Sequence, residues 1–300
     1  MSGVVVVGSV ALDTIEGPAG RRENVLGGSA TYASCSASFF SQASVVACVG
    51  GDFPPSARAV LEERKLDLAG LETVPGSTFR WTGRYTDGFR SRDTLHLDLG
   101  VFAGFRPALA SRLPADSILF LANIDPDLQL DVLEKAGGNA FVATDTIDHW
   151  IRMKRDALAR ALVRTDLFFL NDEEARLITG EENLVKAGGK LLKMGPKFVV
   201  LKKGEHGALL FAPGEMAALP AYPLDEVVDP TGAGDSYAGA MLGWMARTGR
   251  RDAGTMREAM ARAAVVSSFT VEAFGLERLR TLTPDDIAGR LENYGRLARF

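Results

Sequence analysis

Residues 229–241 read DPTGAGDSYAGAM, and this stretch says more about the chain than any other. Three small residues, 232–234, precede Asp235, and we expect a helix from Asp235 to about Arg247. A glycine turn that leads into a helix directs several backbone N–H groups at one point, where the helix dipole adds partial positive charge. The stretch therefore predicts an anion hole with a carboxylate at its edge.

An anion hole beside a carboxylate suits phosphoryl transfer, because the transferred group needs charge neutralisation and the attacking hydroxyl must lose its proton. Asp235 is the candidate general base. The amides of Gly232, Ala233 and Gly234 are the expected cradle. The alternative is a simple β-turn followed by an acid in the first helical turn. The small residues that follow, such as Gly239, favour the functional interpretation, because glycine is costly in a helix unless another element packs closely.

The composition is that of a globular protein with a large core. The chain has 300 residues, of which 46% are hydrophobic and 24% are charged, and its formal net charge is −4. No basic tract stands out, which argues against nucleic acid or an anionic membrane as a partner. We expect Cys35 and Cys48 to be buried thiols of a cytoplasmic protein, since they lack metal-ligand spacing. No apolar run reaches the roughly 18 residues of a membrane span.

Short apolar runs alternate with helix-like segments along the chain. The predicted strands are 4–7, 45–49, 118–121, 141–144, 167–170 and 198–201. The predicted helices are 30–40, 56–65, 128–135, 155–163, 173–179 and 185–194. Such alternation indicates an α/β fold with a mostly parallel sheet between helices. Near the end we expect a pair of strands at 208–211 and 218–221. Two more helices are expected at 252–271 and 284–297.

Residues 71–102 break this alternation. They alternate polar and apolar residues with period two, as strands with one wet face do. We expect a small antiparallel lid, built from about residues 11–26 and 76–102, that covers a pocket and excludes water. The lid is equally a candidate contact in a homodimer. No linker divides the chain, so residues 1–300 are predicted to form one domain.

Two groups of residues near the N-terminus suit a polyol substrate. Gly27 and Gly28 precede a predicted helix, where a ligand hydroxyl can approach backbone amides closely. Asp13 follows the first strand and is able to pair with hydroxyl groups. Each observation is weak alone, because glycine pairs and aspartates are also common in turns.

Polar residues also follow two later strands. Asn171 and Glu174 come after strand 167–170, at the edge where open parallel sheets bind ligands, and suit Mg²⁺ held through water. A helix N-cap with a capping-box acid explains the same spacing.

The segment 202–207, with sequence KKGEHG, ends strand 198–201. Lys202, Gly204 and Gly207 in this segment are candidates to line an adenine nucleotide, and a basic turn is the alternative. No Walker A string and no dinucleotide fingerprint occur, which argues against a P-loop protein and a nicotinamide dehydrogenase.

Three motifs in this order and spacing, Gly27-Gly28, Asn171…Glu174 and 229–235, resemble the ribokinase-like (PfkB) family of sugar and nucleoside kinases. The resemblance spans essentially the whole chain, and the last motif is the most specific. It implies a three-layer α/β/α sandwich with a small β-sheet lid. It also implies that the γ-phosphoryl group of ATP is transferred to an alcohol with the help of Mg²⁺.

The resemblance further implies the roles of individual residues. Asp235 corresponds to the catalytic base, and residues 232–234 correspond to the anion hole. The remaining implied residues contact the substrate, the nucleotide or Mg²⁺: Asp13, Gly27, Gly28, Asn171, Glu174, Lys202, Gly204 and Gly207. Asp229, Thr231 and the loop 270–275 fall where many members hold a monovalent cation such as K⁺.

One departure from the family pattern bears on the substrate. Many members carry a substrate-binding asparagine four residues after the glycine pair, where this chain has Tyr32. A tyrosine stacks on a ring or donates through its hydroxyl. With the lid aromatics Phe79, Trp81 and Tyr85, it favours a nucleoside or a cyclitol over ribose or fructose.

Two alternative functions remain open at this stage. One is a ligand-binding or regulatory protein that keeps the fold without turnover. The other is a kinase of a phosphorylated sugar, whose phosphate would need a cationic pocket. The candidate residues for that pocket are Arg80, Arg84, Arg90 and Arg92.

Overall fold

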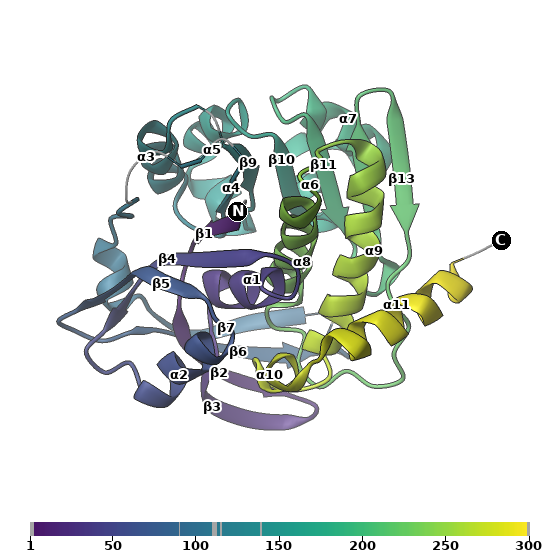
Figure 1. Ribbon diagram of the computed structural model, residues 1–300. Coiled ribbons are helices and arrows are strands. Elements are labelled where there is room, and N and C mark those ends of the chain that lie inside the picture. The colour runs from purple at the N-terminus through teal and green to yellow at the C-terminus, as the bar shows by residue number, and fades with distance from the viewer. Residues whose placement is uncertain (1–2, 90, 110–112, 115, 139, 299–300) are drawn as a thin grey trace.

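A nine-stranded sheet forms the centre of the computed structural model, which describes residues 3–89, 91–109, 113–114, 116–138 and 140–298 (Figure 1). Its strands, in spatial order, are β13 (Glu215–Leu219), β12 (Ala208–Ala212), β11 (Phe198–Lys202), β10 (Leu167–Asn171), β9 (Phe141–Thr144), β8 (Ile118–Leu121), β1 (Gly3–Val7), β4 (Gln42–Gly50) and β5 (Asp67–Val74). All neighbours from β11 to β5 pair in parallel, and β12 and β13 add an antiparallel hairpin. This confirms the predicted mostly parallel sheet.

Helices cover both faces of this sheet. One face carries α1 (Ser29–Ala37), α2 (Pro55–Glu63), α8 (Ala233–Thr248), α9 (Ala253–Thr270), α10 (Glu277–Thr281) and α11 (Pro284–Leu297). The other carries α3 (Pro126–Ala136), α4 (Asp148–Met153), α5 (Arg155–Leu162), α6 (Asp172–Thr179) and α7 (Leu184–Leu192). Because side chains alternate along a strand, Phe169 enters the first core and Phe168 the second. The result is the predicted three-layer sandwich.

Helix α8 packs against α1 at backbone contact. An added Cβ at Gly239 would clash with the carbonyl of Ala33, and one at Gly243 would clash with that of Ala37. The small residues after Asp235 therefore have a structural reason, which is the close approach of these two helices. This contact anchors the N-terminal end of α8 above the carboxyl edge of the sheet.

A separate four-stranded sheet forms the lid, in the order β3 (Gly20–Gly27), β2 (Ala11–Gly17), β6 (Phe79–Thr86) and β7 (Ser91–Asp98). The prediction of an antiparallel lid is wrong at its centre, because β2 and β6 pair in parallel. Between β3 and β6 the chain forms α1, β4, α2 and β5. It then returns to the lid, where β6 runs in the same direction as β2. Residues 71–74 belong to β5 in the large sheet and not to the lid.

Other elements differ from the prediction at their boundaries. Helix α8 begins at Ala233 and includes Gly234 in its first turn, two residues before the predicted start at Asp235. Strand β13 ends at Leu219, earlier than expected, because Gly214 at φ 79° closes a tight hairpin with β12. The short helices α4 and α10 were not predicted. Two 3₁₀ turns, Gly100–Gly104 and Gly204–His206, complete the described elements.

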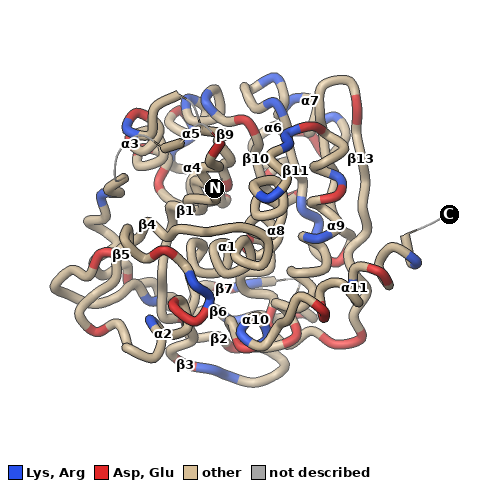
Figure 2. Tube along the Cα trace, in the orientation of Figure 1, with Lys and Arg blue, Asp and Glu red and all other residues tan. Residues whose placement is uncertain are grey.

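Charged residues of both signs are interspersed over the loops and helices, while the central strands β1 and β8 carry none (Figure 2). Both cysteines are buried free thiols, as expected. Within the described ranges, no helix combines the length and hydropathy needed to cross a membrane.

Candidate active site

Asp235 lies in the first turn of α8 and keeps part of its surface open to solvent. Burial and then the charge of Asp145 raise the pKa of its carboxyl group to about 7, against the opposing charges of Lys202 and Arg92. A carboxyl group with a pKa near neutrality is suited to accept a proton from an alcohol. The structure thus gives the predicted base a fitting environment.

The turn before α8 presents free backbone donors beside Asp235. Gly232 is the N-cap in the left-handed conformation, with φ 75°, which favours glycine. The amide of Ala233 donates to the carbonyl of Pro230 over 3.2 Å. Among the described residues, the amides of Gly232 and Gly234 have no hydrogen-bond partner, so they are available to an anion, whereas the Ala233 amide is already used.

Lys202, at the end of β11, brings a positive charge to this turn. Its Nζ lies 3.3 Å from the position that a Cβ of Gly234 would occupy. The same Nζ forms a 2.8 Å ion pair with Asp145, and both side chains are largely buried. Burial lowers the pKa of Lys202, but the charges of Asp145 and Glu174 outweigh it and the net shift is upward. Lys202 therefore stays charged next to the expected anion hole.

Asp145 is a site residue that the sequence analysis missed. It follows β9 directly, is 4% exposed, and influences the pKa values of Asp235, Glu174 and Lys202. Its signal in the sequence is the same as that of Asn171, a polar residue immediately after a buried apolar run. Both sit at the carboxyl edge of the parallel sheet, where ligands bind in this class of fold.

Asn171 and Glu174 form the capping box of α6. Asn171 Oδ1 accepts from the Glu174 amide over 2.8 Å, and Glu174 Oε2 accepts from the Asn171 amide over 2.7 Å. The structural interpretation of this spacing is thus confirmed. Burial, and then the charge of Asp145, raise the pKa of Glu174 to about 8. A cation at this point would favour the ionised form.

The donor set fits Mg²⁺ only in its hydrated form. Within the described part of the chain, no group of three or more His, Cys, Asp or Glu side chains is arranged to hold a metal. Glu174 uses one carboxylate oxygen in the capping box, and its other oxygen accepts no hydrogen bond from a described residue. Mg²⁺ keeps several waters and takes few protein ligands when phosphate is present. Glu174 with Asn171 nearby suits that type of site.

Asp229 ties the turn before α8 to the loop after α9. Its Oδ1 accepts from the Thr231 amide over 2.9 Å, and its Oδ2 accepts from the Gly275 amide over 3.2 Å. The carbonyl of Val271 accepts from the amides of Val228 and Asp229. Asp229, Thr231 and the loop 270–275 are therefore brought together, and a monovalent cation at this place stays a prediction.

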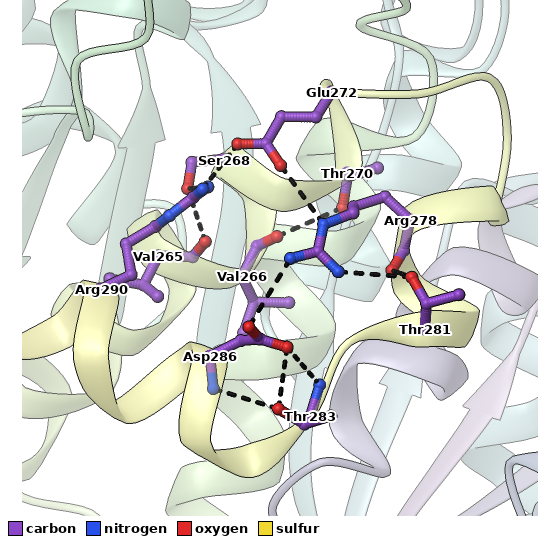
Figure 3. A network of polar contacts seen from close by, with 10 residues as sticks. All are labelled: Val265, Val266, Ser268, Thr270, Glu272, Arg278, Thr281, Thr283, Asp286 and Arg290. Atoms are coloured by element: carbon purple, nitrogen blue, oxygen red, sulfur yellow. Dashed lines mark hydrogen bonds and ion pairs between the residues drawn. The ribbon is translucent and has the colours of Figure 1, made fainter.

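Ion pairs secure this loop to the C-terminal helix. Glu272 binds Arg290 over 2.6 Å and Arg278 over 3.4 Å, as Figure 3 shows. The Arg290 guanidinium also lies 3.4 Å from the centre of the Phe269 ring. Because Glu272 lies next to Val271, α11 helps to hold the backbone that supports Asp229.

Asp13 and the glycine pair form the opposite side of the site. Asp13 on β2 is buried, and burial followed by the charges of Asp229 and Asp235 raises its pKa to about 8. An added Cβ at Gly27 would clash with the Asp13 carboxylate. Gly28 has φ 94°, and a Cβ there would clash with the carbonyl of Ser9. Only glycine fits at either position.

Tyr32 lies beneath the turn rather than on its surface. Its side chain is fully buried, and a Cβ at Gly232 would clash with its ring. Burial and the charges of Asp229 and Asp13 raise the pKa of its hydroxyl far above the usual range. That hydroxyl is buried and has no hydrogen-bond partner among the residues that the structure describes. Tyr32 thus supports Gly232 and sits close to the carboxylates of the site.

Gly204 and Gly207, which were predicted to line the nucleotide, form no hydrogen bond with Asp235 among the described residues. Gly204 is the first residue of a 3₁₀ turn just after β11, and Gly207 follows the last residue of that turn. A Cβ at Gly207 would clash with the carbonyl of Leu219, so this glycine allows close packing against β13. Their location at the carboxyl end of β11 leaves nucleotide binding as a prediction.

Two of the three candidate lid arginines that the structure describes are already paired with carboxylates. Arg80 binds Asp52 over 2.8 Å, and Arg84 binds Glu16 over 2.9 Å. Arg90 lies outside the described residues. Arg92 is close enough to the site for its charge to lower the pKa of Asp235. A phosphate pocket built from several free arginines therefore has little support.

Comparison with known proteins extends these observations. The family model described as pfkB family carbohydrate kinase matches residues 1–281. A cytidine kinase from Thermococcus kodakarensis is 31% identical over 252 residues, which cover 82% of this chain and 90% of the relative. The crystal structure of the Methanocaldococcus jannaschii nucleoside kinase, an archaeal member of the ribokinase family, has a TM-score of 0.78 at 22% identity, covering 98% of this chain and 99% of that one.

A further structure shows the fold with nucleotide bound. A putative ribokinase II from Escherichia coli in complex with ATP and Mg²⁺ has a TM-score of 0.77 at 20% identity, covering 98% of this chain and 100% of that chain. The whole described fold, lid included, is therefore one that known kinases share.

Proposed function

The chain belongs to the pfkB family of carbohydrate kinases, and from this premise we propose that it transfers the γ-phosphoryl group of ATP to a hydroxyl group of a nucleoside, with Asp235 as the general base. The enzyme class, a phosphotransferase with an alcohol as acceptor, follows from the family and its relatives. The observation that carries the proposed mechanism is the carboxyl group of Asp235, whose pKa is raised to about 7, beside two free amides.

The proposed reaction uses groups that already converge on the first turn of α8. The Asp235 carboxylate accepts the proton of the attacking hydroxyl. The amides of Gly232 and Gly234 donate to the transferring phosphoryl group, and Lys202 adds positive charge from the other side. Such preorganised donors act mainly by stabilising charge in the transition state.

Two cations complete the proposed site. Mg²⁺ with the phosphates of ATP would be held through water by Glu174, near Asn171, and would neutralise charge on the phosphates. K⁺ would sit near Asp229, Thr231 and the loop 270–275, where it would stabilise the turn that carries the free amides. The E. coli complex with ATP and Mg²⁺ supports the choice of nucleotide and divalent cation.

The acceptor class rests on the relatives and on the lid. The T. kodakarensis relative is a cytidine kinase, and its similarity covers most of both chains. The buried Asp13 next to the glycine pair suits the hydroxyls of a sugar, and the aromatic lid residues suit a base. Cytidine is therefore the first acceptor to test, in a cytoplasmic enzyme.

The test is an ADP-release assay with ATP, Mg²⁺ and K⁺ against a panel of nucleosides, pentoses, hexoses, cyclitols and sugar phosphates. We expect the strongest turnover with a nucleoside. Asp235→Asn should lower kcat by about 100-fold or more, the usual scale for loss of a general base, and leave ATP binding largely intact. Asp285→Asn is the matched control, because Asp285 is an exposed acid in the first turn of another helix.

Three results would contradict parts of this proposal. Near wild-type turnover in Asp235→Asn would remove the general base. ATP and nucleoside binding without ADP release from any acceptor would favour the regulatory alternative. Turnover with a sugar phosphate alone would replace the nucleoside as acceptor.

A further inference from the structure

Trp81 is a partly buried lid aromatic at the margin of the apolar cluster of Ile15, Tyr85 and Phe274. Phe79 stacks on Phe102, with ring centroids 5.6 Å apart and ring planes inclined by 12°. The Tyr85 hydroxyl lies 3.0 Å from Thr231 Oγ1, and the Tyr85 side chain is buried. Trp81 lies between them on β6 and is only partly buried.

Trp81 is the lid neighbour of Asp13. The two residues are Cα partners in the parallel pair of β2 and β6. Paired residues on adjacent strands point to the same face of a sheet, about 5 Å apart. Leu97 on β7 is the Cα partner of Trp81 and is 54% exposed. The three residues form a row across the lid: the buried carboxylate of Asp13, the indole of Trp81 and the exposed apolar side chain of Leu97.

Neighbouring residues hold the indole in one orientation. Its Nε1 donates to Thr94 Oγ1 over 3.1 Å. Its six-membered ring lies against Gly83, where any Cβ would clash with it. The Arg92 guanidinium is 5.7 Å from the ring centroid. A glycine under the ring and a hydrogen bond at its edge keep a flat apolar group at a fixed place beside Asp13.

We propose that Trp81 is a specificity-determining residue that contacts the planar base of the acceptor nucleoside while Asp13 binds the hydroxyls of its sugar. This inference rests on the proposed function and names the group that reads the base. The sugar of a nucleoside carries hydroxyl groups that suit Asp13, and its flat aromatic base suits the indole of Trp81. A free sugar carries hydroxyls around its whole ring and leaves the indole in water.

Base stacking is strong enough to separate the two classes of acceptor. Stacking of one base on an aromatic side chain is worth about 1–3 kcal/mol, which corresponds to a change of about 5- to 150-fold in affinity. The contribution belongs to binding of the acceptor and not to the chemical step. Its loss should therefore appear in KM for nucleosides and leave kcat nearly unchanged.

The experiment compares Trp81→Leu and Trp81→Phe with wild type in the ADP-release assay, with cytidine, other nucleosides and ribose as acceptors. We expect the nucleoside KM to rise about 5- to 100-fold in Trp81→Leu. Trp81→Phe keeps a flat ring and should show a smaller rise, and KM for ribose should not change in either variant. Trp244→Leu is the matched control, because this partly buried indole lies on α8 outside the lid, where it packs on Phe40 and Arg262, and its loss should leave the nucleoside KM near wild type.

The outcomes separate this inference from the proposed function. A nucleoside KM in Trp81→Leu within about twofold of wild type overturns the inference, and so does an equal rise for ribose. Equilibrium dialysis with labelled cytidine adds a readout that needs no turnover. Binding that is lost in Trp81→Leu, in a protein that releases no ADP, supports the role of Trp81 and overturns the kinase activity. A wild-type enzyme that binds and phosphorylates only sugars overturns the role of Trp81 and the acceptor class, while phosphoryl transfer stands.

Discussion

The two sides of the candidate site differ in how their polar groups are paired. On the side of the large sheet, Lys202 pairs with Asp145, Glu174 and Asn171 cap each other, and Asp229 accepts two backbone amides. On the side of the lid and α1, no described group donates a hydrogen bond to the Asp13 carboxylate. The Tyr32 hydroxyl is also buried, with no hydrogen-bond partner in the described part of the chain.

If the proposed function holds, the phosphoryl side is organised before any ligand arrives, while the Asp13 carboxylate on the acceptor side gains its hydrogen-bond partners from the ligand. Preorganised groups lower the barrier of a reaction because they need no rearrangement in the transition state. Buried polar groups without partners cost free energy, and a ligand that supplies the partners recovers it. An acceptor with well-placed hydroxyls is then bound far better than one without them.

The largest expected effect comes from breaking a pair on the organised side. Asp145→Asn leaves the Lys202 ammonium largely buried without its partner, and breaking a buried ion pair in this way costs about 3–5 kcal/mol. We expect a loss of this order in the free energy of unfolding, measured by urea denaturation. The same variant should also lose activity, because Lys202 lies next to Gly234.

Asp131→Asn is the control for this prediction. Asp131 forms an ion pair with Lys135 over 2.6 Å on the surface of α3, and such exposed pairs contribute less than about 1 kcal/mol. If both variants lose the same small amount, Lys202 and Asp145 do not form a desolvated pair. The polar groups on the large-sheet side of the site would then be less firmly paired than the ion pair of Lys202 with Asp145 suggests.

The second prediction concerns pH and uses the carboxyl groups of both sides. The pKa values of Asp13 and Glu174 are raised to about 8, and that of Asp235 to about 7, so the folded protein keeps protons that the unfolded chain releases near pH 4. Stability falls with pH where the folded state binds more protons. The free energy of unfolding without ligand should therefore decrease from about pH 4 to about pH 8, by at most about 1.4 kcal/mol per pH unit for each group.

Activity should change with pH in the opposite direction. A general base works as the carboxylate, so kcat/KM should rise with pH and level off above about 7, with a slope of up to tenfold per unit below it. Asp13→Asn should weaken the pH dependence of stability, since it removes one of the raised carboxyl groups. A free energy of unfolding that increases between pH 5 and pH 8 would contradict the raised pKa values of Asp13, Glu174 and Asp235.

Much of the fold follows from local patterns in the sequence. The six predicted central strands and the helix 284–297 are present, because branched apolar runs and a capping box carry their own signals. The parallel pairing of β2 with β6 was missed, since pairing between distant strands depends on the path of the chain between them. Helix α4 is only six residues long, too short for a periodic pattern.

The site was predicted best where one continuous motif carries it. Residues 232–235 lie as expected at the start of α8, although the amide of Ala233 already donates a hydrogen bond to the carbonyl of Pro230. Asp145 was missed because it contributes a single acid after a four-residue strand, and only the fold brings it to Lys202. Tyr32 was expected to stack on the substrate or to donate to it through its hydroxyl, and this stays a prediction. The structure shows that its ring lies against Gly232, where a Cβ would clash with it.

The smallest expected effect comes from the bond that joins the two sides. Tyr85 of the lid and Thr231 of the anion-hole turn share a hydrogen bond of 3.0 Å. Tyr85→Phe removes it and keeps the ring in its apolar cluster with Ile15 and Phe274. A single hydrogen bond contributes about 0.5–1.5 kcal/mol to folding, so we expect the free energy of unfolding to fall by about that amount. If the bond also aligns the lid with the turn, KM for the acceptor should rise by about 2- to 10-fold.

Tyr222→Phe is the matched control, because the Tyr222 hydroxyl accepts a hydrogen bond from Asn293 on α11, away from the lid. If the bond of Tyr85 aligns the lid with the turn, only Tyr85→Phe changes KM for the acceptor. Equal kinetics in both variants, with an equal small loss of stability, would mean that the bond only adds to folding. The acceptor side would then close over its ligand without a link to the amides that bind phosphate, and the two sides of the site would be independent.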